Sequence, residues 1–135
     1  MLSRPALIGR AVEKLNALRK ELAAYAAESL AKLFPELREE IAYMVLGGKF
    51  LRGALSLFVA ETLGCTSSSA FPIALAVELM HAASLVYDDI ADSSATRRGQ
   101  PSFWRKYGID EAVTVPHVAV SYTHLRAHET VLDIV

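Results

Sequence analysis

The sequence predicts an all-α protein, and three observations carry this prediction. Apolar residues recur at three- and four-residue spacings along residues 5–33, with lysine and glutamate between them, which is the pattern of an amphipathic helix. Proline and glycine then divide the chain into helix-length segments, at Pro35, Gly47-Gly48 and Gly64. Before residue 113 no stretch alternates apolar and polar residues in the manner of a half-buried strand.

The start and stop signals place each helix in turn. Ser3 is a suitable N-cap for the first helix, and Pro5 fits its first turn. A polar loop at 66–69 precedes the fourth helix, where Pro72 is tolerated in the first turn, and a second polar loop covers 93–100. The predicted helices cover residues 5–33, 36–46, about 51–63, about 70–91 and 101–107. The fourth is apolar on nearly every side, which is typical of a helix at the centre of a bundle.

The composition indicates one globular domain without an electrostatic signature for nucleic acid. The chain has 135 residues, 53% of them apolar, and a formal net charge of −1. The single Cys65 excludes an internal disulfide framework and fits a reducing compartment, so we expect a cytoplasmic protein. Residues 62–77 carry no charge, but Gly64, the serine-rich loop and Pro72 interrupt them, so no transmembrane segment is expected.

The fourth predicted helix carries a line of polar residues on an otherwise apolar surface. His81, Ser84, Asp88 and Asp92 follow one another at steps of three or four residues, so they share one stripe. Asp88 and Asp92 lie one turn apart, where two negative charges repel each other unless a cation lies between them. Carboxylate oxygens suit Mg²⁺. The alternative is a solvated helix end, although acids are unfavourable at a C-terminus.

Two basic segments strengthen the metal interpretation. Arg97-Arg98-Gly99 follows the aspartates closely, and a pair of arginines there is best explained by an anion between them, since the guanidinium matches diphosphate oxygens. A solvated arginine pair is the alternative. The segment Gly47 to Arg52 combines two glycines with Lys49 and Arg52 near a helix N-terminus, which also favours anions. By itself, that segment is better explained as a helix stop with solvated basic residues.

These motifs together resemble the trans-type polyprenyl diphosphate synthases. Gly47 to Arg52 is similar to the family's GGKRxRP, and residues 88–99 fit its first aspartate-rich motif DDxxDxxxxRRG without a gap. The segments 78–81 and 84–87 also resemble the family. The resemblance covers roughly residues 2–113, and it implies the N-terminal part of the isoprenoid synthase helical bundle.

The resemblance also implies roles for individual residues. Asp88 and Asp92 would hold Mg²⁺ at an allylic prenyl diphosphate, with Asp89 contributing nearby, and Arg97 would contact the same diphosphate. The diphosphate of isopentenyl diphosphate would be bound by Gly48, Lys49, Arg52, His81 and Arg98. Asp88, Asp92, Arg97 and Lys49 would be the residues of catalysis. Two residues depart from the family pattern: Phe50 replaces a basic residue, and Gly53 replaces a proline, which should loosen the start of the third helix.

Residues before the aspartates would set the length of the product. In the family, bulky side chains there stop chain growth early, whereas Ala83 and Ser84 are small here, with Met80 a further turn away. These three residues form the expected chain-length pocket, and we expect a product longer than farnesyl, geranylgeranyl first and a longer polyprenyl chain second. The alternative is that the small residues permit close helix packing.

The chain stops resembling the family near Thr114. Residues 120–130 are similar to translated sequencing-adapter read-through, so we expect residues 1–113 to be the N-terminal portion of a polyprenyl synthase domain and 114–135 to be a non-native tail. His124 and His128 lie one turn apart but lack the HExxH pattern of a metal site.

A second aspartate-rich motif, which the family needs, is missing. We therefore expect this polypeptide to be inactive and its full-length parent to be a homodimeric prenyltransferase. Three alternatives remain open: a non-catalytic subunit of a heteromeric synthase, a helical interaction module, and a terpene cyclase.

Overall fold

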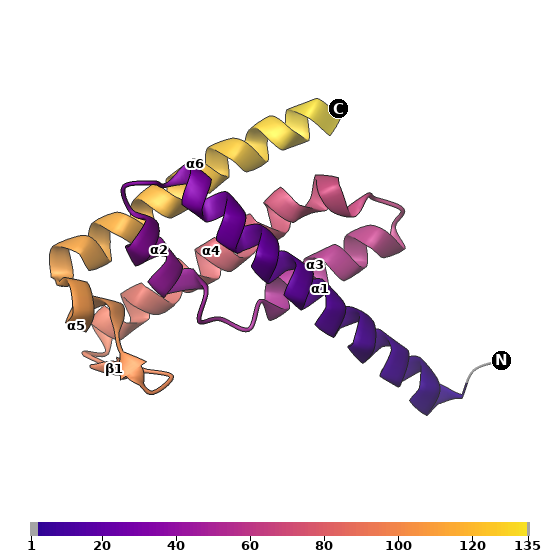
Figure 1. Cartoon of the computed structure of the whole chain (residues 1–135), viewed down its shortest axis with the longest axis horizontal. Coiled ribbons are helices and arrows are strands. Elements are labelled where there is room, and N and C mark those ends of the chain that lie inside the picture. Colours follow the sequence, from indigo (N-terminus) through magenta and orange to yellow (C-terminus); the bar gives the residue numbers. More distant parts are fainter. Residues whose placement is uncertain (1–2, 135) are drawn as a thin grey trace.

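The computed structural model describes residues 3–134, and it confirms the all-α prediction (Figure 1). Helices account for most of the described chain, and the two strands have two residues each. The elements are α1 (Arg4–Leu33), α2 (Arg38–Val45), α3 (Leu51–Thr62), α4 (Ser67–Ala91), β1 (Thr96–Arg97), β2 (Gln100–Pro101), α5 (Phe103–Tyr107) and α6 (Ile109–Ile134).

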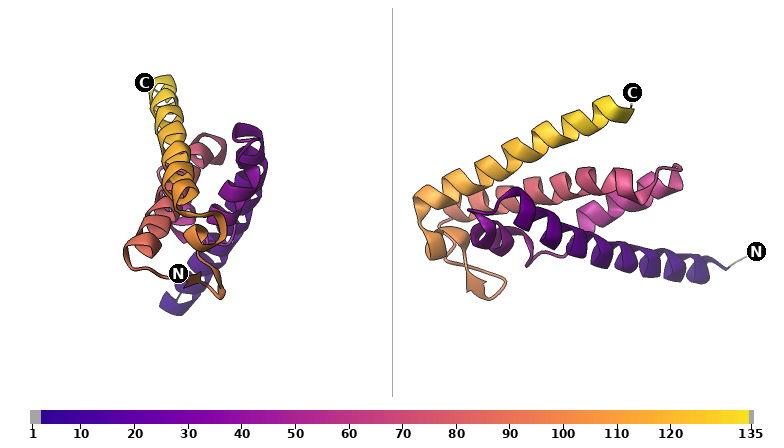
Figure 2. Two further views of the ribbon diagram at one scale, coloured as in Figure 1. Left: turned by 90° about the vertical axis from the view of Figure 1, so that its left-hand side faces the viewer. Right: turned by 45° about the horizontal axis from the view of Figure 1, so that its top comes forward.

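Helix α4 lies at the centre of the bundle. It contacts all five other helices, and Figure 2 shows it between α6 on one flank and the α1–α3 pair on the other. The apolar character that α4 shows on nearly every side follows from this position, because each side meets a neighbour. Helices α2 and α5 and the strand pair gather at the end of the bundle opposite the α3–α4 turn (Figures 1 and 2).

Helix α4 begins three residues before the predicted start. Thr66 is its N-cap, and the backbone N–H of Ala70 donates to the Thr66 carbonyl. The hydroxyl of Ser67 donates to Glu61 at 2.6 Å, and Glu61 also pairs with Lys14 at 2.8 Å. The serines read as a loop therefore form the first turn of the helix, where such residues are favoured, and Pro72 lies one turn further in than expected.

Helix α4 bears on the expectation that no transmembrane segment is present, and that expectation stays a prediction. Within residues 3–134, α4 is the one helix that is long and apolar enough to cross a membrane by length and composition. The serines and Pro72, expected to interrupt this stretch, continue the helix instead. A core helix of a soluble bundle passes the same test.

The segment 93–100, predicted as a loop, contains all of a small hairpin except its last residue, Pro101. Thr96 pairs with Pro101 and Arg97 with Gln100 in antiparallel register. The two turn residues, Arg98 and Gly99, have φ values of 53° and 74°, as a two-residue hairpin turn of the primed type requires. Strands of two residues are too short to show alternation, so the sequence pattern could not reveal them.

Helix α6 includes most of the segment predicted to be non-native. It runs without interruption from Ile109 to Ile134 and buries Ala112, Val115 and Ala119. It packs mainly on α4, and the Tyr122 ring meets Phe34 edge-on at 5.2 Å between centroids. The expectation about the reading frame concerns the gene, and it stays a prediction.

Candidate functional site

One cavity of about 480 Å³ collects side chains from three separate segments. Its walls come from α2, the α2–α3 loop, the start of α3, one face of α4 and the hairpin. It is lined by all the residues predicted to bind a diphosphate: Gly48, Lys49, Arg52, His81, Arg97 and Arg98. Two acids, Glu78 and Asp89, also line it, together with the polar Gln100 and Ser102. Apolar side chains from all three segments make up the rest.

The loop between α2 and α3 is held from both sides. The backbone N–H of Gly48 donates to the Val45 carbonyl at 3.1 Å. Phe50 is buried in the core with φ of 53°, an uncommon left-handed conformation for such a residue. From α1, the Nε of Arg19 donates to the Lys49 carbonyl at 2.6 Å. The loop backbone is thereby fixed, while the Lys49 side chain stays exposed at the cavity.

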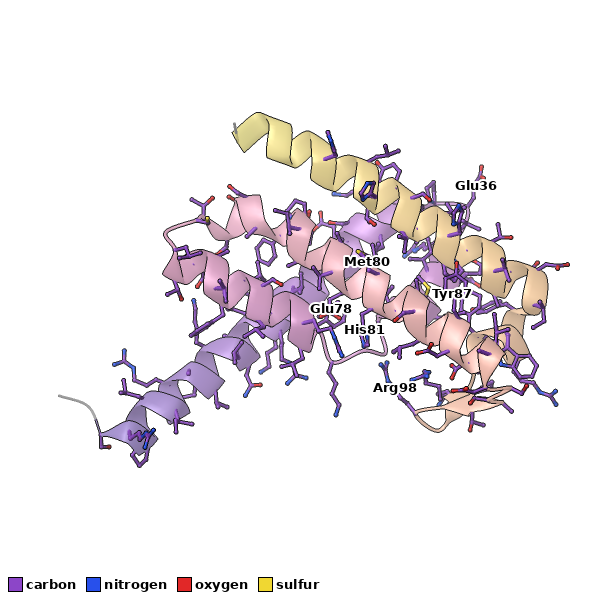
Figure 3. All side chains as sticks on the ribbon, turned by 180° about the vertical axis from the view of Figure 1, so that it is seen from behind. Glu36, Glu78, Met80, His81, Tyr87 and Arg98 are labelled. Atoms are coloured by element: carbon purple, nitrogen blue, oxygen red, sulfur yellow. The ribbon has the colours of Figure 1, made fainter. Side chains whose placement is uncertain are left out.

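The guanidinium of Arg98 lies close to the two glycines of the loop. Its Nη1 is 3.6 Å from the position of a Cβ on Gly47 and 3.8 Å from that of a Cβ on Gly48. Figure 3 shows Arg98 extending from the hairpin toward His81 on α4, and both residues line the cavity. Three cationic side chains, Lys49, Arg52 and Arg98, therefore face one space, which suits a ligand with several negative charges.

Arg52 and His81 form a hydrogen-bonded pair across the cavity, with 3.0 Å between Nη1 and Nε2. The pKa of His81 lies below its ordinary value, first because burial disfavours the charged ring and then because Arg52 is close; Glu78 opposes the shift. A neutral His81 accepts the arginine N–H at Nε2, so Nδ1 carries the ring proton. The pair thus leaves one imidazole N–H and the other guanidinium donors for a ligand.

Gly53 does not loosen the start of α3, contrary to the expectation. Its buried backbone N–H donates to Oε1 of Glu78 at 2.6 Å. A Cβ at this position would lie 2.8 Å from the Ala74 carbonyl oxygen and 2.9 Å from Cγ of Glu78. Glycine therefore permits a close contact of α3 with α4, next to Arg52. The sequence analysis missed Glu78 in this role, because an acid on an apolar helix does not reveal its partner.

Asp89 and Arg97 are bonded to each other. Nε of Arg97 donates to Oδ2 of Asp89 at 2.7 Å, and Nη2 donates to Oδ1 at 2.8 Å. The Asp89 side chain is 5% exposed and that of Arg97 is 36% exposed. The bond to Asp89 raises the pKa of Arg97, so the guanidinium stays charged. Both residues line the cavity, but each uses its main hydrogen-bonding groups on the other.

Asp88 and Asp92 lie outside the cavity, on an adjoining exposed part of α4. The Asp92 N–H donates to the Asp88 carbonyl at 2.8 Å, so the two residues keep the spacing of one helical turn. Among the side chains that the structure describes, those of residues 3–125 and 128, neither carboxylate takes part in an ion pair, and no three His, Cys, Asp or Glu side chains converge as a metal site would require. Two exposed carboxylates fit Mg²⁺, which keeps several water ligands and shares substrate oxygens.

The predicted chain-length residues are divided between two sides of α4. Met80 is 58% exposed and Ser84 is also exposed. Ser84 lies one helical turn before Asp88 and Met80 one turn before Ser84, so all three share one exposed side of α4. Ala83 is 2% exposed. It lies one turn before Tyr87, whose hydroxyl donates to the Val113 carbonyl of α6 at 3.2 Å. Ala83 therefore lies in the helix packing, whereas Met80 and Ser84 face away from it.

The hairpin base carries a residue that the sequence analysis did not single out. Ser102, the N-cap of α5, is 1% exposed and lines the cavity, and its hydroxyl has no hydrogen-bond partner among the described residues. Around it, the Tyr43 hydroxyl donates to the Pro101 carbonyl at 2.6 Å, and Nε1 of Trp104 donates to the Ser94 carbonyl at 2.8 Å. These bonds tie the hairpin to α2 and α5.

Comparison with known proteins gives consistent matches. The profile of the family described as polyprenyl synthetase matches residues 34–134. A hexaprenyl pyrophosphate synthase of Saccharolobus solfataricus is 38% identical over 88 residues, which are 65% of this chain and 31% of that protein. The large subunit 1 of a chloroplastic heterodimeric geranylgeranyl pyrophosphate synthase of Arabidopsis thaliana is 31% identical over 140 residues, covering 100% of this chain and 34% of its own length.

Solved structures show the same relationship. The geranylgeranyl pyrophosphate synthetase of Pyrococcus horikoshii superposes with a TM-score of 0.72 at 31% identity, over 85% of this chain and 37% of that one. The chain thus spans about a third of the length of these relatives.

Proposed function

Because the chain belongs to the polyprenyl synthetase family, we propose that it is the N-terminal portion of a Mg²⁺-dependent prenyltransferase. The proposed reaction joins isopentenyl diphosphate to an allylic prenyl diphosphate and yields a longer all-trans prenyl diphosphate. One observation carries this proposal: two basic segments far apart in sequence place Lys49, Arg52 and Arg98 on a single cavity beside a neutral His81 of α4.

The cavity is the proposed site for the diphosphate of isopentenyl diphosphate. Lys49, Arg52 and Arg98 would neutralise its charge, the imidazole N–H of His81 would add a directed hydrogen bond, and Gly48 would let the ligand approach the loop backbone closely. The loop backbone that carries Lys49 is held by Arg19 and the buried Phe50 before the ligand arrives. Preorganised donors cost little reorganisation when charge moves, which is how such sites favour reaction.

The exposed carboxylates next to the cavity are the proposed metal ligands. Asp88 and Asp92 would hold Mg²⁺, which supplies positive charge to the leaving diphosphate of the allylic substrate. Lys49 would be the catalytic cation on the other side. Asp89 and Arg97, which the resemblance places at the metal and at the allylic diphosphate, lie between these two groups and are paired with each other.

Product length is the finer part of the proposal. Relatives named for farnesyl, geranylgeranyl and hexaprenyl products all match this chain. We place geranylgeranyl first and a longer chain second, since small or flexible side chains, Ser84 and Met80, follow Asp88 down the exposed side of α4. Ala83 belongs to the same proposed pocket only if α6 leaves room beside it.

This 135-residue chain is proposed to be inactive, and residues 114–135 are proposed to be a read-through tail. The missing second aspartate-rich motif supports the first statement, and the adapter-like string supports the second. The family profile nevertheless extends through α6 to residue 134. Re-reading the nucleotide sequence tests whether residues 114–135 are native. A continuous native reading frame past Thr114 would refute the proposal of a read-through tail. A cytoplasmic location and a homodimeric full-length parent complete the proposal.

Calorimetry with inorganic pyrophosphate tests the function at the level of this chain. We expect the chain to bind pyrophosphate without metal, and Mg²⁺ to strengthen binding. A helical interaction module would show no binding under either condition. A non-catalytic subunit of a heteromeric synthase is the alternative that this experiment leaves for a second measurement. It would bind pyrophosphate but lack turnover in the complete reading frame with labelled isopentenyl diphosphate.

A further inference from the structure

The hairpin that carries both arginines is joined to α4 by an ion pair of unusual completeness. Arg97 donates two hydrogen bonds to the two oxygens of Asp89, at 2.7 and 2.8 Å. This fork-to-fork arrangement fixes the plane of the guanidinium as well as its position. A single-point contact would leave the hairpin free to swing about it, whereas the bidentate pair does not.

The position of Asp89 in α4 makes a cationic partner necessary for its carboxylate. Its side chain is 5% exposed and lies in the last turn of α4, where the helix dipole disfavours a negative charge. Leaving such a carboxylate unpaired would be strongly unfavourable. Asp89 is thus committed to Arg97, and the charge of Arg97 is largely neutralised before any ligand arrives. Asp88, the adjacent residue, is exposed and has no such commitment.

The hairpin connects the Asp89–Arg97 pair to Arg98, so the position of the pair affects the position of Arg98. Arg97 and Gln100 face each other in the strand pair, and Arg98 and Gly99 form the turn between them. The φ of 53° at Arg98 is the value that the two-residue primed turn requires, so the turn defines where this side chain leaves the backbone. From this turn, Nη1 of Arg98 lies 3.6 Å from the Cβ position of Gly47.

We propose that the Asp89–Arg97 pair is a positioning element of the anion site that acts through Arg98. The inference rests on the proposed function, namely that the cavity takes a diphosphate. In the chain without ligand, the paired Asp89 and Arg97 hold the hairpin on α4, and the hairpin in turn holds Arg98 at the cavity.

Calorimetry with inorganic pyrophosphate in the presence of EDTA tests this role of the Asp89–Arg97 pair. EDTA removes divalent metal ions, so binding through metal ligation does not contribute to the measured affinity. Three variants of the full chain are compared: Arg98→Gln, the charge-conserving pair Asp89→Asn/Arg97→Gln, and the combination of all three changes. We expect Arg98→Gln to weaken binding about tenfold and the pair variant about three- to tenfold. The triple variant should bind within about twofold of Arg98→Gln, since residues that act through one another are not additive.

Losses that multiply in the triple variant would overturn the inference, because Arg97 would then contact the ligand independently. An unchanged affinity in the pair variant would overturn it as well. The matched control is Glu28→Gln/Lys32→Gln, which removes an exposed ion pair of α1 at constant net charge and should leave pyrophosphate binding at the wild-type level. If the pair variant fails to fold, Arg97→Lys keeps the charge without the fork, and it should weaken binding by a smaller factor that disappears in the Arg98→Gln background.

Hydrogen exchange separates failure of this inference from failure of the proposed function. In the chain without ligand, the pair variant should exchange the amides of residues 96–102 faster than the wild type. If the wild type binds no pyrophosphate at all, the proposed function fails, while faster exchange still supports the anchoring role. Unchanged exchange in the hairpin would show that the pair does not set its position.

Discussion

The backbone N–H of Gly53 donates a hydrogen bond of 2.6 Å to Oε1 of Glu78, across the contact between α3 and α4. Gly53 directly follows Arg52, and Glu78 lies one helical turn before His81; Arg52 and His81 meet at the same cavity. The distance between the two helices at this point therefore decides whether the basic side chains of α3 and the imidazole of α4 come within reach of one ligand.

Replacing Gly53 by alanine should destabilise the chain by about 1–3 kcal/mol, the usual range for overpacking. The added methyl group would lie 2.8 Å from the Ala74 carbonyl oxygen, which is backbone and cannot swing away. Thermal unfolding measures the change. Gly9→Ala is the matched control: a Cβ there meets nothing within 4 Å, and alanine should raise the stability of α1 by about 0.5–1 kcal/mol. Equal melting temperatures for Gly53→Ala and the wild type would contradict the close contact.

His81 should make the stability of the chain depend on pH. Its pKa is lower in the folded chain than its ordinary value of 6.5, so the unfolded chain binds more protons between these two pKa values. Its contribution to stability is fully present above pH 6.5, is lost as the pH falls through the folded pKa, and is constant below that. His81→Gln should flatten the melting temperature across this window, measured at several pH values.

His117→Gln serves as the control for that experiment, because His117 is exposed on α6 and does not line the cavity. It should leave the pH profile of the wild type intact. A His81→Gln chain with the same pH profile as the wild type would show that the imidazole is neither desolvated nor held against Arg52.

Asp88→Asn and Asp92→Asn should each remove most of the gain in pyrophosphate affinity that Mg²⁺ provides. Each variant loses one of two oxygen ligands that the metal would share with the diphosphate, and about a tenfold smaller gain is expected per carboxylate. Titration with and without Mg²⁺ measures it. Asp110→Asn removes the same charge from an exposed position outside the cavity and should keep the full gain. A full gain in the double variant of Asp88 and Asp92 would disprove the metal assignment.

The two small residues before the aspartates should respond differently to phenylalanine. In this chain, Ala83→Phe should lower the melting temperature strongly, since Ala83 is 2% exposed, while Ser84→Phe should hardly change it. In the complete reading frame, Ser84→Phe should shorten the prenyl product, because the ring would block the exposed line below Asp88. Chromatography of the dephosphorylated products reads this out, and an unchanged product would exclude Ser84 from the pocket.

The sequence predicted the helices and the basic lining of the cavity, because both depend on local patterns. Three- and four-residue spacings locate α1 and α4, and a lysine and arginines beside glycines are rare enough to indicate an anion site. The partner of Asp89 could not be predicted in the same way. Asp88 and Asp89 have the same side chain, but Asp88 is exposed and Asp89 is buried beside the hairpin. The strands of this hairpin have two residues each, too few to produce a periodic pattern in the sequence.

The predictions for the start of α4 and for the effect of Gly53 were wrong for a related reason. Residues 67–69 have the composition of a loop, yet the bonds from Ser67 to Glu61 and from Glu61 to Lys14 recruit them into the helix. Gly53 has high intrinsic flexibility, but its neighbours on α1 and α4 leave no space for a side chain. In both cases tertiary contacts outweigh local propensity.

Trp104 is the single tryptophan of the sequence, and its indole N–H is bonded to the Ser94 carbonyl at the base of the hairpin. Indole emission depends on hydration and on the field of nearby charges, so this chain carries an intrinsic optical reporter a few residues from Arg97 and Arg98. Ordering of the hairpin by an anion can be followed by fluorescence at micromolar concentration, without a label and without turnover.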